Sequence, residues 1–96
     1  MEYTSTTIRA FIGAKDYTYS REFYRALGFE ELEIDATMCL IKVNDELSFY
    51  LQDYYVKDWI DNSMLLLTVD NLEACEKDLI NRNLLEQFKG VRISGI

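Results

Sequence analysis

The sequence predicts an α+β fold for the 96 residues as a single small domain. Short runs rich in β-branched and aromatic residues alternate with turn residues, which is typical of strands. Two further segments have the apolar spacing of amphipathic helices, and each follows one of these runs. With 49% hydrophobic residues, 28% charged residues and no proline, the composition is that of an ordinary globular protein.

The first expected strand covers residues 7–12, TIRAFI, and Gly13 closes it. Because side chains alternate along a strand, Arg9 and Phe11 should share one face while Ile8, Ala10 and Ile12 share the other. The strand therefore presents one apolar face and one mixed face.

Asp16 precedes the first expected helix and is a favourable residue to cap it. Gly28 is placed to end the helix in the left-handed conformation, and Phe29 falls where an apolar residue packs back onto the last turn. The apolar positions recur every four residues, at Tyr19, Phe23 and Leu27.

Residues 29–35, FEELEID, alternate and predict a second strand. The segments 37–43 and 46–52 then predict a hairpin around a two-residue turn at Asn44 and Asp45. In the second arm, Leu47, Phe49 and Leu51 should face the core, and Ser48, Tyr50 and Gln52 should lie on the mixed face. We expect this mixed face to line a pocket.

Residues 53–63 lack a clear period and are expected to form a linker. The run MLLLTV, residues 64–69, predicts a buried strand, and Asp70 is expected to cap a helix that ends near Asn83, with Glu73 in the capping-box position. The apolar stripe of this helix comprises Leu72, Cys75, Leu79 and Ile80. The tail resembles a strand at Val91 and Ile93.

The two strand–helix segments resemble each other, and their cap residues Asp16 and Asp70 are 54 positions apart. Such a repeat indicates two copies of one module, each of which needs the other to bury its sheet.

A strand, an Asp-capped helix that ends in FYRALGF and three further strands resemble the glyoxalase/bleomycin-resistance/dioxygenase superfamily, the vicinal oxygen chelate fold. The resemblance covers about residues 7–96. It implies paired βαβββ modules around a cleft, with a first module at about 7–52, the linker at 53–63 and an incomplete second module at 64–96. The matching residues are Asp16, Ser20, Phe23, Tyr24, Leu27, Gly28 and Phe29.

About two strands of the second module are missing, judged by the repeat. The chain is therefore expected to be a truncated form of a longer protein, or to be completed by a second copy as a homodimer, because open strand edges invite partners.

Enzymes of this superfamily hold a divalent metal with His, Gln or Glu side chains. The corresponding positions here carry Arg9, Ser63 and, within a residue or two, Tyr50, and the chain has no histidine. Cys39 and Cys75 lack the spacing of a disulfide framework or a zinc site and are expected to be buried and reduced. We therefore expect no metal, no cofactor and no catalytic residue.

The resemblance then implies a metal-independent small-molecule-binding protein like the bleomycin-resistance proteins, which bind a large, often cationic, planar molecule in the cleft. Aromatic stacking and cation–π contacts would contribute about 0.5 to 2 kcal/mol per ring. Arg9 would disfavour a cationic ligand unless an acid pairs with it. The expected ligand-binding residues are Arg9, Phe11, Ser48, Tyr50, Gln52, Tyr54, Tyr55 and Trp59.

Two alternatives stay open. The chain could be a glyoxalase- or dioxygenase-like metalloenzyme whose ligands come from the missing strands or a partner chain, or a structural remnant that only dimerises. In the second case Tyr54, Tyr55 and Trp59 would pack the linker or the dimer interface. The formal charge of −7 argues against nucleic-acid and anionic-membrane partners, and no signal segment or long apolar run is present, so a cytoplasmic location is expected.

Overall fold

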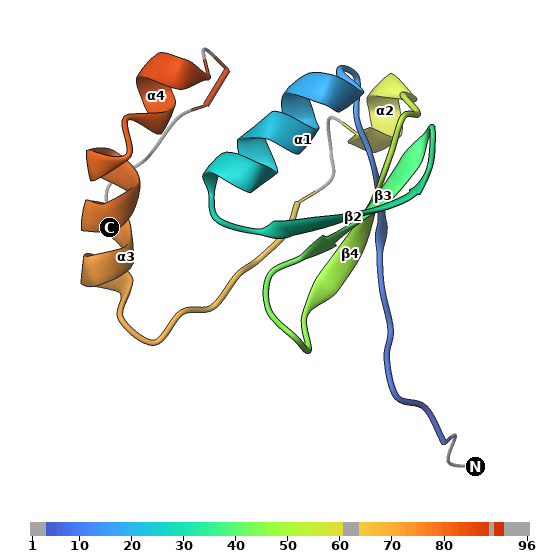
Figure 1. Ribbon diagram of the computed structural model, residues 1–96, viewed down its shortest axis with the longest axis horizontal. Coiled ribbons are helices and arrows are strands. Elements are labelled where there is room, and N and C mark those ends of the chain that lie inside the picture. The colour runs from blue at the N-terminus through green and yellow to red at the C-terminus, as the bar shows by residue number, and fades with distance from the viewer. Residues whose placement is uncertain (1–3, 61–63, 89, 92–96) are drawn as a thin grey trace. The chain divides into compact units, whose positions relative to one another are not determined.

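The computed structural model of this chain describes residues 4–60, 64–88, 90 and 91 (Figure 1). These residues form an α+β fold with a four-stranded mixed sheet. The chain divides into two compact units, residues 1–63 and 64–96, and each is described by itself.

The sheet belongs to the first unit and has the order β1-β4-β3-β2. Its strands are β1 (Phe11–Gly13), β2 (Glu30–Asp35), β3 (Met38–Lys42) and β4 (Ser48–Gln52). β1 pairs parallel to β4, whereas the other neighbours are antiparallel. The predicted hairpin is confirmed as β3 and β4, and the first strand is shorter than predicted.

In the hairpin, the side chains alternate across the sheet as predicted, with one exception. Phe49 and Leu51 of β4 lie in the core, together with Cys39 and Ile41 of β3. Leu47, expected beside them, is 52% exposed because it belongs to the β3–β4 loop. That loop is longer than the predicted two-residue turn, because the Asn44 side chain accepts hydrogen bonds from the backbone N–H groups of Glu46 and Leu47.

Helix α1 (Tyr17–Ala26) contacts β2 and β4 (Figure 1). Both of its predicted ends are confirmed. The Asp16 carboxylate accepts a hydrogen bond of 3.0 Å from the backbone N–H of Tyr19. Gly28 takes a φ of 98°, and the N–H of Phe29 donates to the carbonyl of Tyr24, whose ring stacks on that of Phe29 at 6.3 Å between centroids.

Residues 53–63, the predicted linker, contain the short helix α2 (Lys57–Ile60), and residues 61–63 lie outside the described part of the chain.

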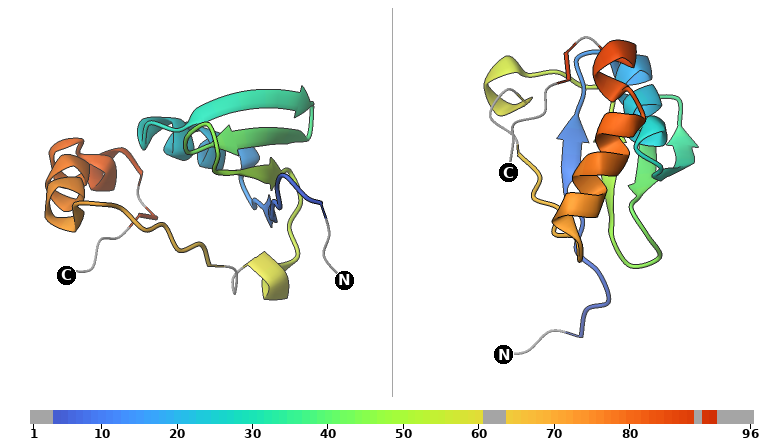
Figure 2. Two further views of the ribbon diagram at one scale, coloured as in Figure 1. Left: turned by 90° about the horizontal axis from the view of Figure 1, so that it is seen from below. Right: turned by 90° about the vertical axis from the view of Figure 1, so that its left-hand side faces the viewer.

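The second unit differs more from the prediction. Residues 64–69 form no strand, and Figure 2 draws them without an arrow. Met64 and Leu66 are 92% and 95% exposed, so the expectation of a buried strand is wrong. An apolar run becomes a strand only where a neighbouring strand takes its hydrogen bonds, and among the described residues none pairs with this one.

Helix α3 (Leu72–Asn81) is capped by Asn71 instead of Asp70. The Asn71 side chain accepts from the N–H of Ala74, which removes Glu73 from the capping-box position. Asn and Asp cap equally well, so composition alone did not decide between neighbours. The stripe is only partly covered: Cys75 and Leu79 are half-buried, but Leu72 and Ile80 are exposed.

The tail after α3 contains a short helix that was not predicted, and the strand expected at Val91 is absent from the described residues. Asn83, at a φ of 56°, begins α4 (Leu84–Gln87), and the N–H of Val91 then donates to the carbonyl of Phe88 in a turn. Val91 belongs to no strand, and Ile93 lies outside the described residues.

Candidate functional site

The sheet has a second face, opposite the core, which we call the open face. It is built by the residues that alternate with the buried ones: Ser48, Tyr50 and Gln52 of β4 lie between or beside Phe49 and Leu51. Register pairing extends it into a row across all four strands, with Phe11 opposite Tyr50, Tyr50 opposite Leu40 and Leu40 opposite Leu32. Phe11 is 58% and Leu32 43% exposed, so this row is an accessible apolar strip.

Four of the predicted ligand-binding residues meet at the β1 end of this row. The rings of Phe11 and Tyr50 are stacked, with 4.7 Å between centroids and 27° between planes. The Arg9 Nε donates a hydrogen bond of 2.7 Å to the Ser48 Oγ, and its guanidinium carbon lies 5.9 Å from the centre of the Tyr50 ring. We call Arg9, Phe11, Ser48 and Tyr50 the platform.

The platform is electrostatically unbalanced. Among the described residues, Arg9 forms no ion pair with a carboxylate. Lys42 lies next to Ser48 in the register of β3 and β4, and its Nζ is 3.9 Å from a carboxylate oxygen of Glu30. Glu30 thus partly offsets the charge of Lys42. The Arg9 guanidinium lies over the Tyr50 ring and is hydrogen-bonded to the Ser48 hydroxyl, which carries no charge to offset it.

The other predicted ligand-binding residues are less closely grouped. Gln52 shares the open face, and its side-chain amide lies 3.9 Å from the sulfur of Met38. Tyr54 and Tyr55 follow β4, and the Lys15 ammonium is 5.5 Å from the centre of the Tyr55 ring. Trp59 belongs to α2, but its side chain lies outside the described part of the structure.

No family model and no curated protein matches this sequence.

The positions that the resemblance assigns to metal ligands can be examined directly. Arg9 and Tyr50 do lie together, but a guanidinium and a phenol do not form a divalent-metal site of the His and carboxylate kind. Within the described ranges, no three His, Cys, Asp or Glu residues are grouped to hold a metal ion. Ser63 lies outside those ranges. The residues present therefore do not fit the divalent metal that the resemblance would imply.

Sequence reasoning missed the contribution of β3 to the open face. Met38, Leu40 and Lys42 are half-buried there, alternating with the buried Cys39 and Ile41. The alternation of residues 38–42 is a visible signal. It becomes informative only when the neighbouring strand, and thus the register against Tyr50, is known.

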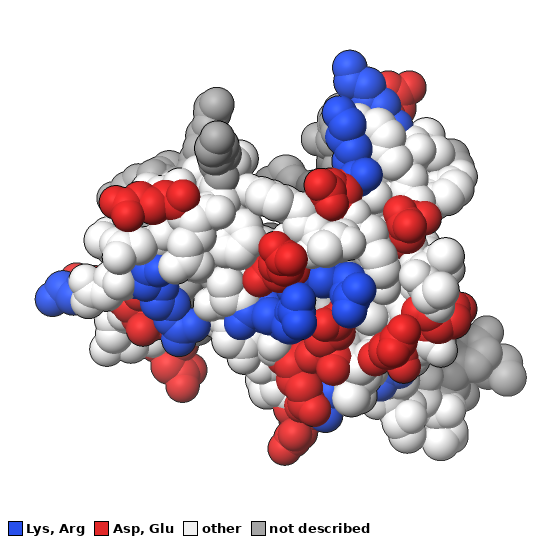
Figure 3. Space-filling model, turned by 45° about the horizontal axis from the view of Figure 1, so that its top comes forward, with Lys and Arg blue, Asp and Glu red and all other residues white. Residues whose placement is uncertain are grey.

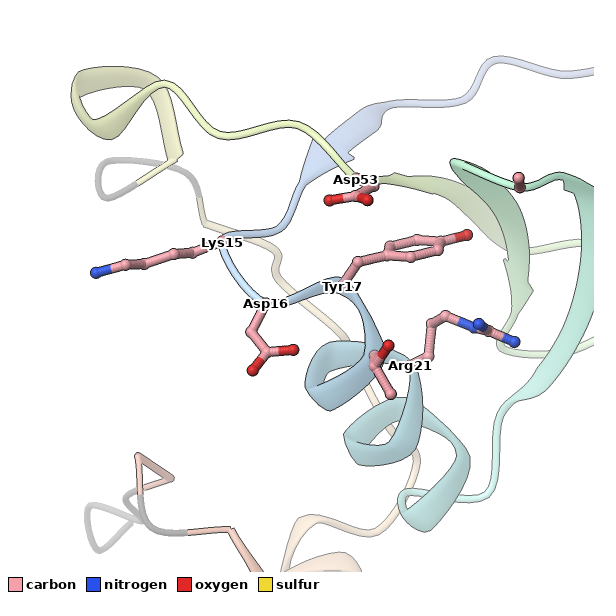
Figure 4. A pocket seen from close by; sticks show the side chains of 7 residues that line it. Lys15, Asp16, Tyr17, Arg21 and Asp53 are labelled. Carbon is pink, nitrogen blue, oxygen red and sulfur yellow. The ribbon is translucent and has the colours of Figure 1, made fainter.

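A separate depression of about 600 Å³ lies at the start of α1 (Figure 4). Its lining includes the charged residues Lys15, Asp16 and Arg21, and each already has a partner. Lys15 lies over the ring of Tyr55, Asp16 caps α1, and Arg21 forms an ion pair with Glu31. In Figure 4, Lys15 points away from the Tyr17 and Arg21 side chains. We therefore place the candidate site on the platform.

Cys39 is buried beneath α1 and is not an activated nucleophile. Burial is the main cause that raises the pKa of its thiol, and Tyr17 hydrogen-bonds to it. Burial and this hydrogen bond also raise the pKa of Tyr17. The nearby Arg21 side chain donates to Glu31, which Arg25 also approaches at 3.6 Å. The free thiol of Cys39 is buried as predicted, whereas that of Cys75 is only half-buried.

Basic and acidic side chains lie next to one another on the face drawn in Figure 3. Among the described helices, none has both the length and the apolar character needed to cross a bilayer.

Proposed function

We propose that this protein binds a small planar molecule without a metal, in the manner of bleomycin-resistance proteins, and that the ligand lies on the platform. The observation that carries the proposal is the stacked pair of Phe11 and Tyr50 on an accessible sheet face, with Arg9 held beside it. The exposed part of this ring pair offers apolar contact area for a flat ligand, and the guanidinium adds a directional polar group.

The fold supports the same proposal. The first unit has the element order β1, α1, β2, β3, β4, which is that of a βαβββ module, with helix α1 on one face of the sheet and the platform on the other. In a paired arrangement, the open face of each module would form one wall of a cleft. Clefts of this kind are apolar with a few placed polar groups, as the platform is.

We further propose that a second copy of this chain supplies the other wall, which makes the protein a homodimer. Two features support this proposal: β1 and β2 are the edge strands of the sheet, and the apolar side chains of Phe11 and Leu32 are exposed on the open face.

The binding proposal is tested by replacing one ring of the platform. Fused-ring aromatic compounds, such as naphthalene and acridine derivatives, should bind the native chain and shift the amide resonances of Phe11 and Tyr50. Tyr50→Leu keeps an apolar side chain at this position but removes the stacked ring, so the affinity should fall about three- to tenfold. Isothermal titration calorimetry measures this change.

Tyr19→Leu is the matched control, because Tyr19 is an exposed tyrosine of α1 outside the platform. The control should leave the affinity within about twofold of the native value, a change smaller than one stacking contact. Equal losses in both variants, or shifts confined to residues outside the open face, would contradict the placement of the ligand on the platform.

A further inference from the structure

We infer that the ligand of the platform is a flat aromatic anion, with a carboxylate or phosphate at the edge of its ring system that pairs with Arg9. This inference rests on the proposed function and names its ligand class. It departs from the cationic ligand that the resemblance implies.

The first argument is the state of Arg9. A guanidinium carries five N–H donors, and the Nε of Arg9 is used by Ser48. Among the described residues, no carboxylate pairs with this guanidinium. The remaining donors lie in a planar fork that matches a carboxylate or a phosphate.

The second argument is the position of the charge. The guanidinium carbon lies 5.9 Å from the centre of the Tyr50 ring, which in turn stacks on Phe11. A ring system bound against Phe11 and Tyr50 would therefore lie close to the Arg9 guanidinium. A cationic group on that ring system would meet a like charge, and an anionic group would meet an opposite charge with which no described carboxylate pairs.

The third argument is the next row of the open face. Ser48 stands between Arg9 and Lys42, and Glu30 is the carboxylate that approaches Lys42. Two cations and one carboxylate leave a local excess of one positive charge. The chain as a whole has a formal charge of −7, so this sign is opposite to that of the protein.

The negative net charge of the protein works against the expected result. A net charge of −7 attracts cations, so a preference for an anionic ligand cannot arise from the net charge of the molecule. At 0.15 M salt, the screening length is about 8 Å, and the charges nearest the ligand then dominate.

The experiment compares two probes of the same shape and opposite charge, 2-naphthoate and 2-naphthylmethylamine, by calorimetry at pH 7.5 and 0.15 M salt on the full chain. We expect the carboxylate to bind about fivefold tighter than the amine, as one partly exposed ion pair allows. 2-Naphthyl phosphate, as a third probe, shows whether the site favours the phosphate or the carboxylate.

Two variants of Arg9 test whether its positive charge causes the preference for the carboxylate over the amine. Arg9→Gln should bring the two affinities within about twofold of each other, and Arg9→Lys should keep the carboxylate favoured, because a cation remains. Arg25→Gln is the charge-matched control: it removes one positive charge from an exposed position of α1, which lies on the other face of the sheet, and the preference should persist.

The outcomes separate the two proposals. Tighter binding of the amine, or a carboxylate preference that survives Arg9→Gln, would overturn the anionic ligand while the platform itself stands. Failure of every probe to bind the native chain would overturn the platform as a binding site and the anionic ligand with it.

Discussion

Three groups in the first unit, Tyr17, Tyr24 and Cys39, give up their protons less readily in the folded protein than in the unfolded chain. Burial raises the pKa of each above its usual value, which is 10.0 for the tyrosines and 9.0 for the cysteine. Tyr24 packs its ring edge-on against Phe49, with 5.2 Å between centroids. The fold therefore favours the neutral form of each of these side chains.

The stability of the protein should consequently fall above about pH 9. Below the usual pKa values both states hold these protons; above them the unfolded chain releases protons that the folded state retains. The free energy of unfolding then decreases, with a limiting slope of about 1.4 kcal/mol per pH unit for each group. Urea unfolding at pH 8 and pH 10.5, followed by circular dichroism, measures the difference.

Tyr24→Phe keeps the ring but removes the ionisable hydroxyl, so its stability should decline less steeply with pH. Tyr54→Phe, at a position 53% exposed, should behave like the native protein. A stability that is constant or rises up to pH 10.5 would contradict the burial of these groups.

The platform shows how far sequence alone can predict a site. Alternation in residues 7–12 and 46–52 predicted that Arg9, Phe11, Ser48 and Tyr50 share one face, because side chains alternate along any strand. Their contact depends on β1 lying parallel beside β4, and the 39 positions between Arg9 and Ser48 carry no local signal of that pairing. Leu32 and Leu40 were missed for the same reason.

At the level of elements, helix α1 was predicted well because its two ends are encoded by single residues. Asp16 caps the first turn, and Gly28 ends the helix at a φ of 98°. Side chains other than glycine are strained at such an angle. The end of α1 in turn sets the start of β2, so Gly28 fixes the connection between helix and sheet.

Gly28→Ala should therefore destabilise the protein by about 1 kcal/mol, since alanine must adopt the left-handed conformation. The urea midpoint should fall while the far-ultraviolet spectrum stays unchanged. Gly90→Ala is the control, because a methyl group there would meet no atom within 4 Å and the stability should be nearly unaffected. Equal midpoints for the two variants would show that the turn at Gly28 relaxes without cost.

The elements of the second unit were predicted less well, because its local sequence has no end signals as clear as Asp16 and Gly28 of α1. Residues 64–69 have the apolar composition of a buried strand, yet they are exposed and unpaired within the described chain. A strand is a relation between two segments, whereas a helix closes its own hydrogen bonds. The second segment therefore contains the predicted helix, capped one residue later than expected, but lacks the strand predicted at 64–69.

On the scale of the whole molecule, the core is unevenly distributed. The buried cluster of the first unit contains Ala14, Tyr17, Cys39, Ile41, Phe49 and Leu51, whereas the buried described residues of the second unit are Leu84 and Phe88. Apolar side chains on the open face and at residues 64–67 are left accessible. A chain of this size gains much from covering such surface with a partner.

We expect sedimentation equilibrium to give a mass approaching twice 11.3 kDa as the concentration rises. Leu32→Lys, which places a charge in the apolar strip of the open face, should shift the equilibrium toward the monomer. Asp45→Lys, in the exposed β3–β4 loop, changes the net charge more and should leave the dimer intact. A mass of one chain at all concentrations up to about 100 µM, well above the dissociation constants of stable dimers, would contradict the homodimer.

The parallel pairing of β1 with β4 also bears on the order of folding. The hairpin of β3 and β4 closes a short loop, but the contact of Arg9 with Ser48 closes one of 39 positions, and the entropy of closing a loop grows with its length. Contacts of high sequence separation tend to form after local ones. We therefore expect the platform to form last during folding, so that a ligand that contacts both Arg9 and Tyr50 would also hold the first strand against β4. The N–H of Tyr50 donates to the carbonyl of Ala10, so its amide hydrogen should exchange more slowly when the ligand is bound.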